Sequence, residues 1–200
     1  MNKFVLTYIT IGLICILSSG CAASIKSNRA NVGNNLSSNS SSTNVDSQNP
    51  YLVHSSLERL TNFINSYNKN LGYDQARLVA DAILQASNTY RVNYRVVTAL
   101  VAIESGFRAD AHSPSGAMGL GQLMPATARG LEVSDPFNPQ DNLNGAVKLL
   151  RTHLEKFNGN INYVLGAYKM GAGTVSRSGI NQPTTISYIK QVRDVFDQVP

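Results

Sequence analysis

The chain has 200 residues, of which 42% are hydrophobic and 14% are charged, and its formal net charge is +5. This length predicts one globular domain of ordinary size together with additional segments. The basic excess suits an anionic partner, but no motif or platform of aromatic and basic residues accompanies it, which excludes nucleic-acid binding. The three histidines, His54, His112 and His153, are scattered along the chain and lack the spacing of metal ligands, so we predict no metal site.

Residues 1–21 have the pattern of an export signal. A short, positively charged start precedes fourteen uncharged and mostly apolar residues, 4–17. Because a membrane-spanning helix needs about 20 apolar residues, this run favours a secretory signal, with an uncleaved anchor as the alternative. The small residues before Cys21 resemble a lipoprotein processing site, although Leu17 lies one place further from the cysteine than that pattern expects.

The sequence predicts that Cys21 is acylated, and ordinary signal cleavage after Ala22 or Ala23 is the alternative. Two or more acyl chains would hold the exported, periplasmic protein at a membrane, for which the outer membrane is favoured. Cys15 is the other cysteine, so the mature domain would contain neither a disulfide nor a thiolate nucleophile. Residues 22–50 are rich in Ser and Asn, and they predict a flexible linker because they cannot bury enough apolar surface to become ordered.

Residues 51–200 form the predicted globular domain, in which apolar residues recur at helical spacing. Ser55–Glu58 has the pattern of a capping box at the start of the first helix, and Asp74 is expected to cap the second. No hairpin signal separates the helical segments, so the predicted fold class is all-α. Later helices are expected to end at Glu104, to span 126–131, to open at Asn138-Pro139, and to span 161–170 and 186–196. The expected core residues of the first, second and long helices are Leu57, Leu60, Ile64, Tyr67, Val79, Ala82, Ile83, Ala86, Leu143, Ala146, Val147, Leu150, Leu154 and Phe157.

Glu104 is the candidate catalytic residue, because it ends an apolar helix. At helical spacing it shares one face with Val97, Leu100 and Val101. A glutamate at the end of such a buried face loses hydration, which disfavours its charged form and raises its pKa towards the range that a general acid needs near neutral pH. A glutamate that only solvates a helix end is the commoner case, and the residues after Glu104 decide between the two.

The loop that follows is punctuated by glycines. Gly106 is expected to end the helix in the left-handed conformation. Gly116, Gly119 and Gly121 let the backbone approach a ligand or a neighbouring helix closely. Pro125 suits the first turn of the next helix.

The order of residues from Glu104 to Ala128 resembles the catalytic domain of the soluble-type lytic transglycosylases, a family with a lysozyme-like fold. The shared string is Glu-Ser, followed by Ser-Pro-x-Gly-Ala-x-Gly-Leu-x-Gln-Leu-Met-Pro-x-Thr-Ala. Segments 135–145 and 185–192 resemble two further motifs of that family, Asn-Ile-x-x-Gly and Glu-Thr-x-x-Tyr-Val-x-x-Val. The resemblance covers nearly all of the globular part, 88–195.

This sequence departs from the family pattern at two positions. Segment 167–171, Ala-Tyr-Lys-Met-Gly, stands where the family usually has Ala-Tyr-Asn-x-Gly, so Lys169 replaces an asparagine. Thr184 replaces the glutamate that usually precedes Thr185. We expect both positions to support the cleft, so the departures bear on substrate affinity more than on the type of reaction.

The resemblance implies a peptidoglycan lytic transglycosylase that needs no cofactor. Glu104 would act alone as acid and base: it would protonate the oxygen between N-acetylmuramic acid and N-acetylglucosamine, then accept the proton of the C6 hydroxyl. A 1,6-anhydro ring would close without water. By position, Ser113 and Gln122 would hydrogen-bond the sugars, and Met124 would line the floor of the cleft.

Tyr168 and Tyr188 lie in matching motifs, and the resemblance makes both cleft residues. Tyr188 would hold the acetamido group or the developing positive charge. Outside these motifs, a helix tyrosine usually packs in the core with its polar tip bonded, and a turn serine, a surface amide and a core methionine would be the ordinary roles of the other three residues.

Two other functions stay open. A hydrolytic muramidase of the same fold needs a positioned water and, in most glycosidases, a second carboxylate. Asp110, six residues after Glu104, is the nearest candidate, ahead of Asp135 and Asp141, although its polar surroundings favour a turn or surface role. A non-catalytic wall-binding module is the other function, and the intact motif around Glu104 argues against it. The small size of the chain alone suggests a secretion or conjugation apparatus as a partner.

Overall fold

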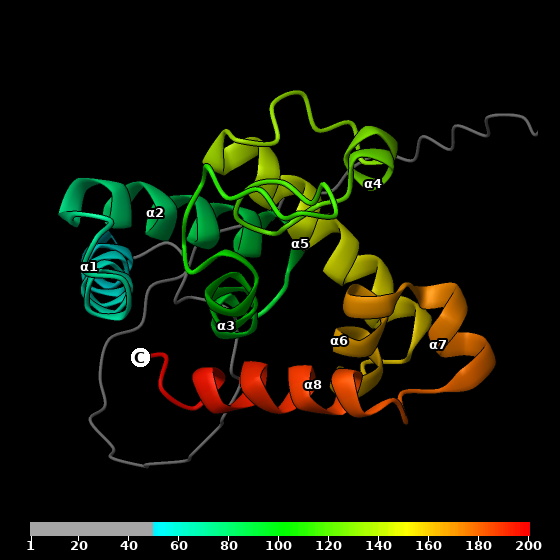
Figure 1. The fold of residues 1–200 in the computed structure, drawn as a ribbon. Helices are drawn as coiled ribbons and strands as arrows, with labels where there is room; N and C mark the ends of the chain where they lie inside the picture. Colours follow the sequence, from blue (N-terminus) through cyan, green and yellow to red (C-terminus); the bar gives the residue numbers. More distant parts are fainter. Residues whose placement is uncertain (1–49) are drawn as a thin grey trace, which may run out of the picture. The chain divides into compact units, whose positions relative to one another are not determined.

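The computed structural model describes residues 50–200, with side chains from His54 onwards. These residues form eight α-helices and no β-strand, which confirms the all-α prediction (Figure 1). The predicted signal segment 1–21, with Cys21, and linker residues 22–49 lie outside the described residues. The helices are α1 (Pro50–Tyr67), α2 (Tyr73–Tyr90), α3 (Tyr94–Ser105), α4 (Pro125–Gly130), α5 (Pro139–Lys156), α6 (Ile161–Met170), α7 (Ala172–Ser178) and α8 (Pro183–Phe196).

Most helix positions agree with the sequence prediction. α6 spans the predicted residues, and α5 begins at the predicted proline, where the side chain of Asn138 accepts hydrogen bonds from two backbone N–H groups of the first turn. α8 begins at Pro183, three residues before its predicted start. α7 was not predicted, because only Val175 of its seven residues is buried and such a helix has no periodic apolar face.

Both predicted helix caps near the start of the domain are wrong. α1 already begins at Pro50, so Ser55–Glu58 lies inside the helix and forms no capping box. A proline is favoured in a first turn, where an N–H has no intrahelical acceptor in any case. Gly72, and not Asp74, is the N-cap of α2. Asp74 lies in the first turn, where its carboxylate complements the partial positive charge of the helix N-terminus.

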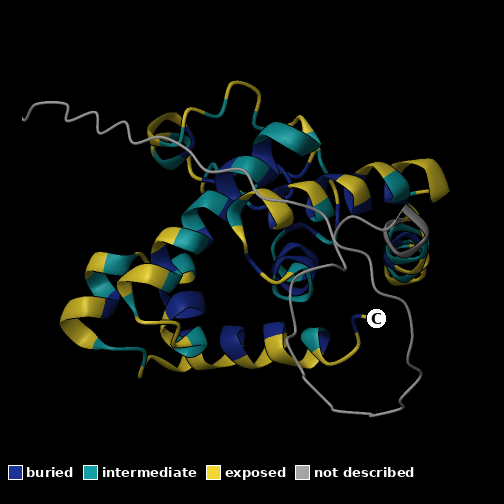
Figure 2. Cartoon of the chain, turned by 180° about the vertical axis from the view of Figure 1, so that it is seen from behind, coloured by how far each residue is buried: buried dark blue, intermediate teal, exposed yellow. Residues whose placement is uncertain are grey.

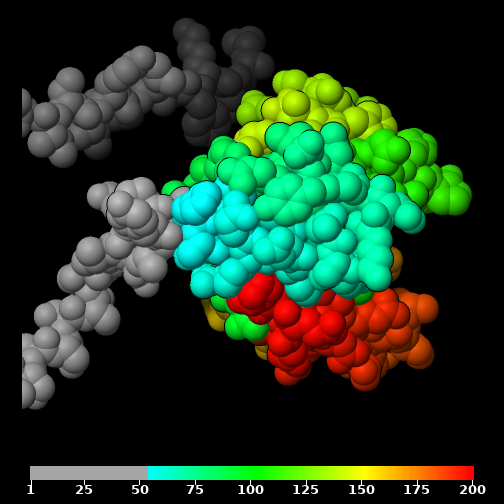
Figure 3. Space-filling model, turned by 90° about the vertical axis from the view of Figure 1, so that its left-hand side faces the viewer, coloured from blue at the N-terminus to red at the C-terminus, as the bar shows by residue number. Residues whose placement is uncertain are grey.

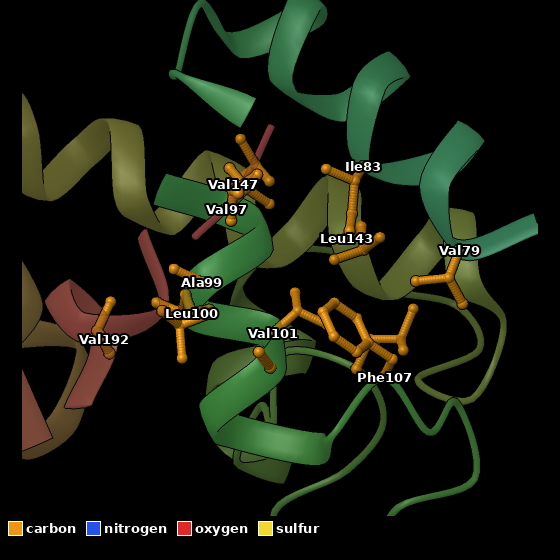
Figure 4. Close-up of a cluster of buried hydrophobic side chains, with 14 of the residues drawn as sticks. Val79, Ile83, Val97, Ala99, Leu100, Val101, Phe107, Leu143, Val147 and Val192 are labelled. Atoms are coloured by element: carbon orange, nitrogen blue, oxygen red, sulfur yellow. The ribbon is translucent and has the colours of Figure 1, made fainter. Parts of the chain in front are cut away.

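α3 lies at the centre of the core. Residues 97–102 are all buried, so its apolar surface is wider than the single face that the sequence predicts. Figure 4 shows side chains of α3, including Leu100 and Val101, in one buried cluster with Ile83 of α2, Leu143 of α5 and Val192 of α8. Because helices pack around α3 on several sides, its last turn is held in a fixed position.

The surrounding helices are buried on one side only. In Figure 2 the inward face of α8 is buried and its outward face is exposed. Figure 3 shows α1 and α2, in cyan and green, covering one face of the domain. Within residues 50–200 no helix has the length and apolar composition that crossing a membrane requires.

The predicted core is largely confirmed. Tyr67 is the exception at 42% exposure, because the C-terminal end of α1 lies at the surface. Leu57, Leu154 and Phe157 are partly buried at the edge of the main core cluster. The remaining predicted core residues are buried: Leu60, Ile64, Val79, Ala82, Ile83, Ala86, Leu143, Ala146, Val147 and Leu150.

The exit from α3 determines where the connection between α3 and α4 begins. We call this connection, residues 106–124, the glycine loop. Gly106 adopts the expected left-handed conformation with φ 60°, and its N–H donates to the carbonyl four residues earlier. Phe107 also has a positive φ, 65°, although it is not a glycine. Its fully buried ring packs edge-on against Phe63 and Tyr67 of α1. Burial of this ring offsets the unfavourable backbone conformation and sets the direction in which the loop leaves Glu104.

Candidate active site

Glu104 lies in the last turn of α3 and is partly buried. Burial raises the pKa of its carboxyl group above the ordinary value of 4.5. A hydrogen bond from Tyr188 and the positive charge of Lys169 act in the opposite direction. Since burial is the largest effect, the group holds a proton to higher pH than an exposed glutamate, as a general acid must.

Tyr188 reaches Glu104 from α8, which packs directly against α3. Its Oη donates a hydrogen bond to Glu104 Oε1 at 2.6 Å, and the residue is only 4% exposed. Burial and the neighbouring carboxyl raise the pKa of Tyr188 well above its usual value, so the phenol remains a donor. The packing of two helices thus joins residues that are 84 positions apart in sequence.

A surface hollow of about 510 Å³ gives access to this pair. Of the residues that line it, all of which are described, Glu104 is the one carboxyl and Lys169 the one cation. A second hollow, of about 350 Å³, lies on α1 and α2 and does not include Glu104. We assign the active site to the first hollow, because it contains a carboxyl whose pKa is shifted by burial. Its lining residues are Ile103, Glu104, Lys169, Pro183, Thr184, Ser187, Tyr188 and Gln191.

The glycine loop is fastened to α5 by the side chain of Asn142. This amide is fully buried. Its Oδ1 accepts from the N–H of Gly121 at 2.7 Å, and its Nδ2 donates to the carbonyls of Met118 at 3.0 Å and Pro136 at 2.8 Å. Asn142 lies in segment 135–145, which resembles a family motif, but the sequence predicts no role for this residue, because two of its three partners lie 21 and 24 positions away.

Two glycines are required where the loop meets α5. A Cβ atom on Gly119, whose φ is +70°, would overlap the carbonyl oxygen of Pro136. A Cβ atom on Gly121 would lie 2.6 Å from Cβ of Ala146, closer than van der Waals contact allows. The close backbone approach that the sequence predicts for these glycines is therefore an approach to α5 and to the turn that precedes it.

Tyr168 supports the same loop from α6. Its Oη donates to the carbonyl oxygen of Gly121 at 2.7 Å. Burial, with a smaller effect of Glu104, raises the pKa of Tyr168 well above its usual value. Tyr168 is not among the residues that line the hollow, so its hydroxyl serves the loop, and a direct role in the cleft stays a prediction.

The other three predicted site residues are Ser113, Gln122 and Met124. They lie on the glycine loop and, like Tyr168, are not among the residues that line the hollow. Ser113 Oγ accepts from the N–H of Ala117 at 2.9 Å, which is a turn contact. Gln122 has φ 48°, and its Nε2 donates to two carbonyls of the loop. Met124 is 44% exposed and is the N-cap residue of α4. Their contacts with sugars stay predictions, since their observed contacts shape the loop.

Asp110 does not join Glu104. It is exposed and is absent from the lining of the hollow. Asp141 lies in the first turn of α5, and Asp135 accepts a hydrogen bond from a neighbouring backbone N–H in the preceding turn. The arrangement therefore gathers one carboxyl, one phenol and one ammonium in the hollow.

Removing the phenolic hydroxyl with Tyr188→Phe should slow turnover and shift its pH dependence. That hydroxyl stabilises the ionised form of Glu104, so its loss should raise the pKa of Glu104 further. The alkaline decline in activity, where the acid loses its proton, should then move to higher pH. The free energy of unfolding should change by about 1 kcal/mol or less. A pH–rate profile and a thermal melt test both points; a large loss of stability with unchanged turnover would make Tyr188 a core residue only.

The described residues thus form an all-helical domain in which a partly buried carboxyl group lies at the end of the central helix α3. The family model described as "Transglycosylase SLT domain" matches residues 81–189, more than half of the chain, and the chain belongs to this family. A transglycosylase of Enterobacteria phage PRD1 is 41% identical over 91 residues, which are 46% of this chain and 34% of the relative. Membrane-bound lytic murein transglycosylase F of Vibrio cholerae is 34% identical over 87 residues, which are 40% of this chain and 16% of the relative.

Two solved structures share the fold. An inactive mutant of lytic transglycosylase Slt from Pseudomonas aeruginosa superposes with a TM-score of 0.54 at 23% identity, over 58% of this chain and 23% of that chain. The 70 kDa soluble lytic transglycosylase of Escherichia coli gives a TM-score of 0.56 at 20% identity, over 70% of this chain and 29% of that chain. The chain therefore spans about a third or less of the length of each of these relatives and structures.

Proposed function

We propose that this domain is a peptidoglycan lytic transglycosylase in which Glu104 is the single acid and base. Membership of the transglycosylase family and the names of the relatives, which are transglycosylases, support the reaction class. The observation that carries the proposal is that Glu104, with a pKa raised by burial, is the one carboxyl of the hollow's lining.

The proposed reaction begins with proton transfer from Glu104 to the oxygen that joins N-acetylmuramic acid to N-acetylglucosamine. The bond from that oxygen to the muramyl C1 breaks, and the muramyl N-acetyl group assists the departure of the N-acetylglucosamine unit. The muramyl C6 hydroxyl then attacks C1 while the Glu104 carboxylate accepts the hydroxyl proton. A 1,6-anhydro ring closes, Glu104 is again protonated, and no water is consumed. Tyr188 would stabilise the carboxylate between the two steps through its hydrogen bond.

A hydrolytic muramidase is the competing function. An inverting glycosidase needs a second carboxylate to activate water, and retaining enzymes use the second carboxylate as a nucleophile. No second carboxyl occurs among the lining residues of the hollow, which are all described. The C6 hydroxyl is part of the bound sugar, so proximity favours it over a free water molecule.

Analysis of the products tests the proposed function. Released disaccharide-peptides should end in 1,6-anhydro-N-acetylmuramic acid, and each should be lighter by one water than the corresponding hydrolysis product. They should have no reducing end, so borohydride should not change their mass. Mass spectrometry of fragments from purified peptidoglycan, before and after borohydride treatment, checks both properties. Predominance of reducible, full-mass muramic acid ends would contradict the proposal and favour the muramidase.

We also propose export and lipid anchoring through Cys21. The apolar run 4–17 and the small residues before the cysteine support this proposal. Cys21→Ala should move the protein from the membrane fraction to the soluble periplasmic fraction, because two or more acyl chains on Cys21 would supply the attachment. Metabolic labelling with a fatty acid gives the direct measurement. A wild-type protein without label would indicate ordinary signal cleavage instead.

A further inference from the structure

Lys169 places a positive charge in the same hollow as the candidate acid, Glu104. It lies in the last turn of α6 and lines the hollow with Glu104. Its Nζ lies 5.1 Å from the centre of the Tyr188 ring, and the hydroxyl of the same ring donates to Glu104. None of the three ion pairs among the described residues includes Lys169. The ammonium group thus stands at the hollow without a carboxylate partner from the described part of the chain.

A cation at this position opposes the proposed chemistry as long as no substrate is bound. Its charge lowers the pKa of Glu104, against the effect of burial, although a general acid must keep its proton. The transition state of glycosidic cleavage also carries positive charge on the sugar, which a nearby ammonium repels. Both unfavourable effects are removed when an anion pairs with Lys169.

Two ordinary roles explain only part of this arrangement. A cation is favoured near the C-terminal end of a helix, and an ammonium is attracted to the face of an aromatic ring. Lys156, in the last turn of α5, satisfies the first preference without lining the hollow. Neither role requires the charge to stand beside the acid.

We propose that Lys169 binds a carboxylate on the lactyl side chain of the muramic acid unit, and that it selects glycan strands by the charge of this side chain. The inference rests on the proposed function. The lactyl carboxylate itself is free where no stem peptide is attached, whereas in a strand with stems the lactyl carboxyl is an amide and the peptide supplies the carboxylates. Either source gives the same ammonium–carboxylate pair, which strengthens as the bound sugar displaces water.

Binding measurements with the Glu104→Gln variant test this proposal without cleavage. The probes are soluble glycan fragments with stem peptides, fragments freed of stems by an amidase, and both kinds after conversion of their carboxyl groups to neutral amides. Adding Lys169→Met should weaken binding of the carboxylate-bearing fragments about tenfold and change binding of the neutral fragments less than about twofold. Lys169→Arg should retain most of the affinity because it keeps the charge.

Lys190→Met is the matched control. It removes one charge from α8, where Lys190 pairs with Asp194 at 2.6 Å outside the hollow lining, and it should leave binding of all fragments unchanged. Equal weakening of charged and neutral fragments by Lys169→Met, or no weakening of either, would overturn the proposal. Weakening confined to fragments without stems, or to fragments with stems, supports it and identifies the source of the carboxylate. Reducible ends in the product analysis would contradict the proposed function alone, since these binding ratios do not depend on the products.

Discussion

Glu104→Gln should abolish cleavage of peptidoglycan and leave the fold intact. The amide has nearly the same shape as the carboxyl group, and its oxygen can still accept the hydrogen bond that Tyr188 now donates to Oε1. It has no proton to give to the glycosidic oxygen and cannot accept one from the C6 hydroxyl. Because one group is proposed for both transfers, we expect turnover to fall by at least about a thousandfold, within the usual range for general acid–base catalysis.

The measurement is the release of soluble fragments from purified peptidoglycan, with circular dichroism to verify the fold. Asp110→Asn is the matched control, because it removes the acidic residue nearest to Glu104 in sequence, which is exposed and outside the hollow lining. It should keep wild-type turnover. Comparable clearing by the Glu104→Gln variant would show that another group is the acid, and a similar loss in Asp110→Asn would restore the two-carboxylate muramidase.

The Glu104→Gln variant should gain stability relative to the wild-type protein as the pH rises. The folded protein raises the pKa of Glu104 above 4.5, so it binds this proton more tightly than the unfolded chain does. The stabilising contribution of Glu104 is therefore complete below the unfolded value and is lost as the pH rises through the folded value. Since glutamine does not titrate, the melting temperature of Glu104→Gln relative to wild type should increase over that interval. Parallel thermal melts at acidic and neutral pH test the sign.

The fold was predictable where local signals are strong. α6 has an apolar period with an asparagine cap, and Gly106 adopts the left-handed conformation that ends α3. The start of α1 and the existence of α7 were not predictable in this way. The residue pattern of a capping box can occur inside a helix without forming one, and a helix of seven residues with one buried side chain shows no period.

In the candidate site, the acid and its hydrogen-bond partner were predictable from the sequence, whereas the contacts that shape the loop were not. Glu104 stands out through its position at the end of an apolar helix, and the matching motif adds Tyr188, which the structure brings to 2.6 Å from it. The sequence could not show that Ser113 and Gln122 use their side chains within the loop. Nor could it reveal the role of Asn142, because that role depends on backbone groups up to 24 positions away that fold against α5.

Asn142→Ala should destabilise the domain strongly and reduce its activity at the same time. The change leaves the N–H of Gly121 without its acceptor and the carbonyl of Pro136 without its donor, at a site where Asn142 itself is fully buried. The carbonyl of Met118 loses one of two hydrogen bonds and keeps the one from the N–H of Leu123. An unpaired buried polar group costs about 1–3 kcal/mol, so we expect the free energy of unfolding to fall by roughly 3 kcal/mol or more. That is a large share of the stability of an ordinary domain, about 5–15 kcal/mol.

Asn144→Ala provides the matched control, two residues further along α5. Its side chain is partly buried and accepts one hydrogen bond, from Gln140 of the same helix, so the loss should stay within about 1 kcal/mol. Urea unfolding of both variants measures the difference, and turnover at a temperature where each remains folded separates stability from activity. The Asn142 side chain fastens the loop that begins just beyond Glu104, so folded Asn142→Ala should still turn over more slowly than folded Asn144→Ala. Equal stability and equal turnover of the two variants would mean that the loop keeps its position without the buried amide.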